Sequence, residues 1–157
     1  MLTLVATLLA LRSADGQACG SMCPTMNYFN SFGEVCVSGY ASDLDCEWNL
    51  ECGTGTPLLT FSEFSTEQRR DYVRVYDGSE PRGNLEIFDA SGDLDTPFEI
   101  AGTGSQLLVR FTSDGSTSSD GFGAVFTCQG GGGDIQPPPG GGPDIDPVPP
   151  PADDPSW

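Results

Sequence analysis

Two β-prone runs separated by a charged turn constrain the fold of this chain more than any other stretch. The runs are Leu58–Phe64 and Tyr72–Tyr76, and both are rich in aliphatic and aromatic residues. In Asp71–Gly78, β-branched and aromatic residues alternate with charged ones until an Asp-Gly pair, which is typical of a half-buried strand that stops at a tight turn. Glu67 and Asp71 lie beside this predicted hairpin, so we expect either a cation or open water to relieve their repulsion.

Further short runs of the same kind follow along the chain, separated by turns that contain glycine, proline and aspartate. Trp48 is expected in the core, because Cys46, Trp48 and Leu50 fall on one face of a strand. Short strands at close intervals, with no helical period, indicate an all-β sandwich. The remaining predicted strands are Cys46–Leu50, Leu85–Phe88, Pro97–Ile100, Gln106–Thr112 and a last one that carries Phe122, Ala124 and Phe126 and ends at Cys128.

Both ends of the chain differ from this central part. Met1–Ala10 is an apolar run of signal-peptide length that is too short to span a bilayer. We expect a signal peptide over residues 1–18, cleaved after Ala18 or after Gly16, and the alternative is a buried segment. Residues 129–157 consist mainly of glycine, proline and aspartate, so they are predicted to form a disordered tail or a linker to a further module.

Charge and the lack of histidine exclude several classes of function. The chain has 23 acidic residues against 6 basic ones, all of them arginine, and a net charge of −17. Such a field disfavours nucleic acids and anionic membranes and favours cations, either metal ions or basic patches on proteins. Without histidine, Ser–His and Cys–His catalysis and histidine metal sites are excluded. We therefore expect no enzymatic activity from this chain.

Six cysteines in a short chain indicate an oxidising compartment. Together with the apolar N-terminus they predict a secreted, extracellular protein. Cys19 and Cys23 lie close together in a short polar segment. They predict either a small disulfide loop or half of a zinc site, although no further ligands with suitable spacing lie nearby.

Several groups of residues, in a fixed order, carry a resemblance to a known family. They are Cys46–Trp48, the pattern F-x-x-F-x-T-E at Phe61–Glu67, the pattern D-x-V-x-V-Y-D-G at Asp71–Gly78, Phe111–Asp114 and Gly121–Phe122. On these residues the chain resembles the CUB domain, a small extracellular β-sandwich, over about residues 36–128. The resemblance implies a jelly-roll of two antiparallel sheets, with residues 19–35 as a short cysteine-containing segment before it.

The same resemblance implies a calcium site. In the calcium-binding members of the family, the positions of Glu67, Asp71 and Asp114 are ligands. A tyrosine at the position of Tyr40 steadies the glutamate through its hydroxyl; the other interpretation of Tyr40 is a surface tyrosine in a turn. Glu67 and Asp71 are closer together in sequence than in many vertebrate members, which leaves Glu63 in the preceding strand as an alternative ligand. The other interpretation of the three acids is that they are exposed loop residues.

Ser116 and Thr117 are expected to add carbonyl or hydroxyl oxygens to this site, because Gly115 lets the loop fold its carbonyls inward. Three carboxylates and one Ca²⁺ leave about one negative charge, which a lysine or arginine of a partner can pair with. The predicted function is therefore an extracellular protein-binding module that recognises a basic side chain. Two alternatives stay open: a structural spacer of a secreted matrix or wall, and a non-catalytic accessory domain of a larger secreted protein.

The resemblance also guides the disulfide prediction. Many CUB domains have two local disulfides, and the cysteine pair usual in the second half is absent here. By that comparison we expect Cys52–Cys128, with Cys36–Cys46 and Cys19–Cys23 completing one of 15 possible connectivities.

Overall fold

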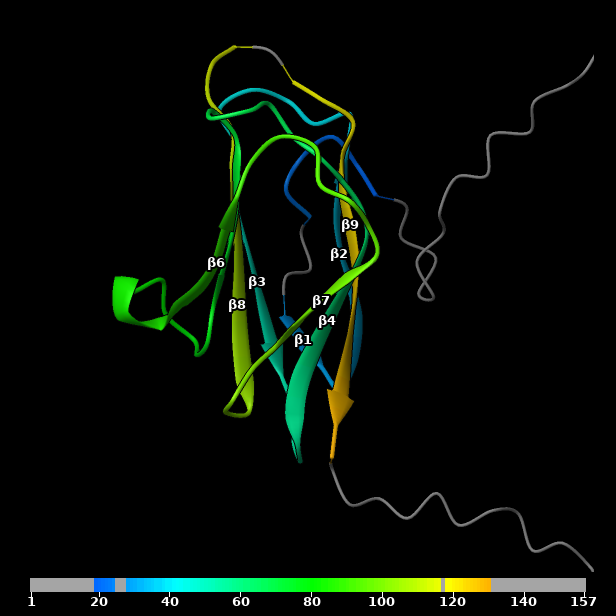
Figure 1. The fold of residues 1–157 in the computed structure, drawn as a ribbon, viewed down its shortest axis with the longest axis vertical. Coiled ribbons are helices and arrows are strands. Elements are labelled where there is room, and N and C mark those ends of the chain that lie inside the picture. The colour runs from blue at the N-terminus through cyan, green and yellow to red at the C-terminus, as the bar shows by residue number, and fades with distance from the viewer. Residues whose placement is uncertain (1–18, 25–27, 117, 131–157) are drawn as a thin grey trace, which may run out of the picture.

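Two facing β-sheets make up the described part of the molecule (Figure 1). The computed structural model describes residues 19–24, 28–116 and 118–130. The predicted signal peptide, Thr117 and the predicted tail beyond Gly130 lie outside the described residues. Among the described residues the one helical element is a 3₁₀ turn, η1 (Gly83–Leu85), and no helix there has the length and apolar character to cross a bilayer. The predicted all-β sandwich is confirmed.

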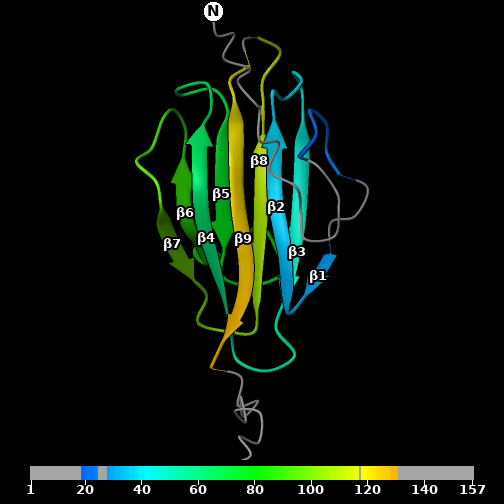
Figure 2. The ribbon, with the colours of Figure 1, turned by 90° about the vertical axis from the view of Figure 1, so that its right-hand side faces the viewer.

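The sheets contain five and four strands among the described residues. Neighbouring strands are antiparallel, except for the first two of the five-stranded sheet, which are parallel. Figure 2 turns the four-stranded sheet toward the viewer. From one edge to the other, the five-stranded sheet consists of β1 (Tyr28–Asn30), β3 (Asp45–Glu51), β8 (Gln106–Thr112), β5 (Tyr72–Tyr76) and β6 (Glu86–Ala90). The four-stranded sheet consists of β2 (Phe32–Ser38), β9 (Gly121–Gln129), β4 (Thr56–Ser65) and β7 (Phe98–Ala101).

Strands β4 and β5 do not form the predicted hairpin. β4 pairs with β7 and β9, whereas β5 pairs with β6 and β8 in the other sheet. Each strand buries one apolar face in the shared core, with Phe61 and Phe64 from β4 and Val73 and Val75 from β5. The prediction of a hairpin was wrong because two strands that each have one apolar face can bury it equally well by packing face to face. The turn between them therefore crosses from one sheet to the other.

Aromatic side chains fill the space between the sheets. Trp48 is 1% exposed, and its ring meets that of Phe122 edge to face with the centroids 5.9 Å apart. Tyr40, which follows β2, meets Phe111 in the same way at 4.8 Å. Ring quadrupoles favour such edge contacts over face-to-face stacking. The predicted core position of Trp48 is confirmed, and the ring of Tyr40 belongs to the same core.

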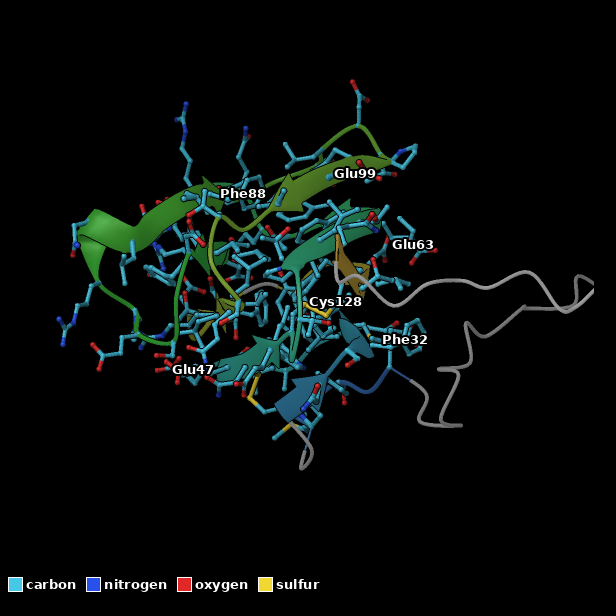
Figure 3. The ribbon with its side chains drawn as sticks, turned by 90° about the horizontal axis from the view of Figure 1, so that it is seen from below. Phe32, Glu47, Glu63, Phe88, Glu99 and Cys128 are labelled. Carbon is cyan, nitrogen blue, oxygen red and sulfur yellow. A yellow bond between two sulfur atoms is a disulfide. The ribbon has the colours of Figure 1, made fainter. Side chains whose placement is uncertain are left out.

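Three disulfides are present, and two of them differ from the prediction. Cys52–Cys128 is as predicted and joins the end of β3 to β9, so it links the two sheets. Figure 3 views the molecule from below and shows this bond in yellow beside Cys128. The other two bonds are Cys19–Cys36 and Cys23–Cys46. The predicted pairs Cys36–Cys46 and Cys19–Cys23 are therefore wrong.

The alternation of side chains along the strands explains this correction. On β2, Cys36 lies between the buried residues Val35 and Val37, so it points away from the core. On β3, in the other sheet, Cys46 is 2% exposed and points into the core beside Trp48. Two cysteines whose side chains point in such different directions cannot be bridged.

Each cysteine of the N-terminal segment instead reaches a different sheet. The backbone holds this segment in place, because Gly20 accepts a hydrogen bond from the Ser38 amide at 3.0 Å and Ser21 accepts one from the Ala41 amide at 2.8 Å. Both cysteines of the segment are oxidised, so the zinc interpretation fails for want of thiolates. The predicted domain boundary at residue 36 also falls inside β2, which begins at Phe32.

Candidate metal centre

The predicted ligands come together at one end of the sandwich, where the cyan, green and yellow loops meet at the top of Figure 1. Glu67 lies in the turn after β4, Asp71 directly precedes β5, and Asp114 follows β8. One carboxylate oxygen from each of the three lies within 4.8 Å of the others. We call these three residues the acidic cluster. Strands of both sheets thus position it, which a single hairpin would not do.

Asp71 is the buried member of the acidic cluster. Its side chain is 1% exposed, and both carboxylate oxygens accept hydrogen bonds. Oδ2 accepts the hydroxyl proton of Tyr40 at 2.6 Å, and Oδ1 accepts the backbone N–H of Asp114 at 2.9 Å. A carboxylate has about four lone-pair positions, so these two bonds fix its orientation and leave it able to bind a cation.

Tyr40 connects two parts of the site. Its hydroxyl donates to Asp71 and accepts the backbone N–H of Glu67 at 3.0 Å. The resemblance predicted that Tyr40 steadies the glutamate, and the contact is to the backbone of Glu67 rather than to its carboxylate. Burial, and next the hydrogen bond to Asp71, raise the pKa of Tyr40 to about 12. Tyr40 therefore stays protonated at neutral pH and remains a donor to Asp71.

The close spacing of Glu67 and Asp71 follows from a tight turn. The Asp71 amide donates to the carbonyl of Glu67 at 3.1 Å, which closes the turn. The hydroxyl of Thr66, a residue that is 4% exposed, donates to the carbonyl of Asp71 at 2.9 Å and accepts the Gly92 amide at 3.0 Å. A threonine is suited to this position because its hydroxyl can donate and accept at once.

Asp114 is held by the loop that follows it. Its Oδ1 accepts the Ser116 amide at 2.9 Å and the Ser116 hydroxyl at 2.6 Å. The same hydroxyl lies 3.2 Å from Oε2 of Glu67, so Ser116 bridges two carboxylates. These hydrogen bonds from Ser116, more than the nearby charge of Arg70, lower the pKa of the Asp114 carboxyl. Thr117, the other predicted loop ligand, lies outside the described residues.

Glu63, the predicted alternative to Glu67, is not part of the cluster. It lies on β4 opposite Gly123 and is exposed. Figure 3 shows its side chain pointing away from the space between the sheets. A β-bulge between Phe61 and Glu63 precedes it, and the chain reaches the cluster only at Glu67.

The donor set suits a hard divalent cation. It offers three carboxylates and a hydroxyl, all of them oxygen ligands, which calcium binds at about 2.3–2.6 Å. Oxygens around one such ion can be at most about 5 Å apart, and the 4.8 Å limit within the cluster meets this condition. In the described residues, one ion pair reaches the cluster, from Arg70 to Asp114 Oδ2 at 3.8 Å. The chain's own residues thus fit Ca²⁺ in charge, chemistry and spacing.

Sequence reasoning missed the loop after Tyr40, which supports Asp114. The Asp43 amide donates to the carbonyl of Asp114 at 2.9 Å, and the Ser42 hydroxyl donates to the carbonyl of Ser116 at 3.0 Å. The Ser113 hydroxyl also donates to the carbonyl of Ala41 at 2.9 Å. These partners lie about 70 positions apart in sequence, so no local spacing could have revealed them.

Comparison with known proteins places the fold in a family. The sequence model of the CUB domain matches residues 16–126. Tolloid-like protein 2 of Mus musculus is 35% identical over 98 residues, which are 59% of this chain and 10% of that protein. Inactive serine protease PAMR1 of Pongo abelii is 34% identical over 99 residues, 60% of this chain and 14% of that protein. The chain thus spans between about a tenth and about a fifth of the length of such curated relatives.

Solved structures agree on the fold. The CUB1-EGF-CUB2 domains of rat MASP-1 match with a TM-score of 0.54 and 23% identity, over 64% of this chain and 41% of that one. The MASP-1 CUB2 domain bound to Ca²⁺ matches with a TM-score of 0.54 and 20% identity, over 65% of this chain and 97% of that one. At such identities the likeness shows the fold alone.

CUB domains are typically extracellular protein-interaction modules of larger proteins, and the domain itself is non-catalytic. Some relatives are proteases by name, such as the astacin-like metalloendopeptidase of Gallus gallus, and this chain matches 22% of that protein's length. The described residues carry the sandwich, the disulfides and the ordered motifs expected of such a domain. With the family match over most of its length, the chain belongs to the CUB domain family.

Proposed function

We propose that this chain is a secreted protein-binding module whose acidic cluster binds Ca²⁺ and, with the ion in place, contacts a lysine or arginine of a partner protein. One observation carries the proposal: the buried carboxylate of Asp71 is oriented by Tyr40 and by the Asp114 backbone toward two further carboxylates. Burial of a carboxylate is costly unless a cation or enough donors compensate it. An ion at this place would provide that compensation.

The roles of the individual residues follow from their surroundings. Glu67, Asp71 and Asp114 would supply the negative charge, with Asp71 as the fixed point, because both of its oxygens are already oriented. Ser116 and Thr117 would add neutral oxygens from the loop. A bound ion supplies the positive charge that holds the three carboxylates together. The Ser116 hydroxyl, which bridges Glu67 and Asp114, can turn its lone pairs toward a cation.

The choice of a basic partner rests on charge balance. Three carboxylates and one Ca²⁺ leave about one negative charge at an exposed loop end. A lysine or arginine side chain is the protein group that would pair with it, and the net charge of −17 would attract a basic partner at long range. The Ca²⁺-bound MASP-1 CUB2 domain shows that this fold holds the ion in another protein.

The setting we propose is extracellular. The three disulfides require an oxidising environment, and residues 1–18 have the apolar pattern of a signal peptide. One observation favours a second role, that of an accessory domain in a larger secreted protein. The relatives matched here are far longer than this chain, so the binding activity would then serve chemistry carried by other domains.

Calorimetric titration of calcium into the full chain, with its disulfides formed, tests the proposal. We expect about one ion per chain, and we expect Glu67→Gln to weaken binding at least tenfold. Glu80→Gln is the matched control, because Glu80 is exposed and lies beyond the far end of β5. The calcium affinity of the Glu80→Gln variant should equal that of the original chain. No saturable heat up to about 10 mM calcium, well above the range of extracellular sites, would falsify the calcium site.

A further inference from the structure

A single arginine from the same turn lies against the acidic cluster. Arg70 stands between Glu67 and Asp71 in sequence, and its Nη1 lies 3.8 Å from Oδ2 of Asp114. The side chain of Arg70 is 66% exposed and that of Asp114 is 32% exposed. Arg70 is thus a basic side chain of this chain that lies where the proposed function places the basic side chain of a partner.

The two oxygens of Asp114 differ in what they contact. Oδ1 accepts both the amide and the hydroxyl of Ser116, whereas Oδ2 faces Arg70. The contact with Arg70 therefore uses the oxygen that is not committed to the loop's own hydrogen bonds. A cation or a partner that binds Asp114 through this oxygen would therefore compete with Arg70.

We propose that Arg70 is an internal competitor at the acidic cluster: it lowers the affinity for Ca²⁺ and must leave Asp114 before a partner's lysine or arginine can bind there. This inference rests on the proposed function and adds a regulator to it. The physical basis is simple. A positive charge beside a cation site repels the cation, and one carboxylate oxygen cannot serve two basic groups equally well.

The strength of the contact suits a competitor that can be displaced. Ion pairs between exposed side chains are weak, and the 3.8 Å separation is at the long end for such a pair. Arg70 can therefore leave Asp114 at small cost when an ion or partner arrives. The expected effect is a change of about three- to tenfold in affinity, since a tenfold change corresponds to about 1.4 kcal/mol.

The neighbouring arginine provides a matched control. Arg69 carries the same charge in the same turn and is exposed. Its backbone has a φ of 62°, and its amide donates to the Ser91 hydroxyl at 2.8 Å. It forms no ion pair with any residue that the structure describes. A comparison of the two arginines therefore separates contact with Asp114 from the general effect of one positive charge.

The first experiment is calorimetric titration of calcium into the full chain and its Arg70→Gln and Arg69→Gln variants. We expect Arg70→Gln to bind calcium about three- to tenfold more tightly than the original chain, and Arg69→Gln to change the affinity less than twofold. Equal effects of the two substitutions, or no effect of Arg70→Gln while calcium still binds, would overturn the inference and leave the proposed function intact. No calcium binding by any of the three proteins would overturn both.

A second experiment needs no calcium. Unfolding in denaturant with excess chelator, for the single variants Arg70→Gln and Asp114→Asn and their combination, measures the coupling of the two side chains. We expect the effects on the unfolding equilibrium constant to be non-additive by about two- to fivefold. The same cycle with Arg69→Gln should be additive. Additive behaviour in the Arg70 cycle would show that Arg70 does not occupy the site, and the inference would fail whatever the calcium affinity.

Discussion

Acidic side chains meet very different surroundings on the outer face of the five-stranded sheet and at the loop end of the sandwich. On the sheet, Arg110 binds both oxygens of Asp45, at 2.8 and 2.7 Å. Arg74, directly opposite Arg110 on the next strand, lies 3.5 Å from Asp89. Strand register thus gives these acids a basic partner from the neighbouring strand.

At the loop end, three carboxylates converge, and among the described residues a single ion pair, 3.8 Å long, reaches them. The backbone amides and hydroxyls around them orient the carboxylates without neutralising them. On the sheet face, acidic side chains thus form ion pairs with arginines of the neighbouring strand. In the acidic cluster, three carboxylates lie together with only one long ion pair among the described residues. The predictions below test whether this cluster is a cation site.

The largest contrast is expected between Asp71→Asn and Asp45→Asn, which remove one negative charge each from the two regions. Asp71→Asn should weaken calcium binding by about a hundredfold, because the number of charged ligands sets the affinity of such sites. Asp45→Asn should leave it within twofold. Calorimetry on both variants gives the answer, and comparable losses in the two would mean that only the net charge matters.

Removal of calcium should lower stability by about 2 kcal/mol when the starting concentration is about twenty times the Kd. The ion binds the folded chain and not the unfolded one, because only folding brings together the ligands from loops of both sheets. Denaturant unfolding with calcium and with chelator measures the difference. The Asp45→Asn variant should lose as much stability on calcium removal as the original chain, whereas Glu67→Gln, with at least tenfold weaker binding, should lose about 0.7 kcal/mol or less. If Glu67→Gln lost as much stability on calcium removal as the original chain, the stabilising ion would have to bind elsewhere.

Tyr40→Phe should destabilise the calcium-free fold by about 1–3 kcal/mol, because Asp71 loses a buried donor and the Glu67 amide loses its acceptor. Tyr72→Phe is the control on the sheet face, where Arg74 lies over the ring at 4.7 Å. It keeps the ring and should change stability by less than about 0.5 kcal/mol. Equal stabilities of the two variants in denaturant would contradict a structural role for the Tyr40 hydroxyl.

The smallest effect is expected from Arg110→Gln, which should cost about 0.2–1 kcal/mol at neutral pH and leave calcium binding unchanged. The hydrogen bonds from Arg110 hold the pKa of the Asp45 carboxyl below its usual range. A carboxyl whose pKa is lower in the folded state stabilises the fold above its unfolded pKa, and this contribution is lost as the pH falls through the folded value. The stability difference between Arg110→Gln and the original chain should therefore shrink below about pH 4. A difference that persists at low pH would show packing by the arginine stem instead.

The sequence pattern predicted seven of the nine strands among the described residues but missed β1 and β2 near the N-terminus. Period-two alternation predicted β5 and β8 with their observed ends. The resemblance to the CUB domain, and not the alternation, indicated that Glu67, Asp71 and Asp114 lie together. The same alternation could not decide which sheet each strand joins, and the predicted hairpin of β4 and β5 failed for that reason.

What remained beyond the sequence depends on contacts between distant segments. Cys19 and Cys23 are neighbours in the chain, yet each bonds a cysteine on a different sheet. The outward direction of Cys36 becomes evident only once β2 is known to pair with β9. The support of Asp114 by Asp43 likewise joins loops that share no motif. Local periodicity carries no information about such partners.

The most direct test of the central claim follows the backbone amide signals of the isotope-labelled full chain by NMR during a calcium titration. The account predicts saturable shifts for Glu67, Asp114 and Ser116, with a common affinity, and almost none for Glu47 and Arg110 on the sheet face. Signals that do not move, or that move equally in both regions without saturation, would contradict a specific calcium site at the acidic cluster.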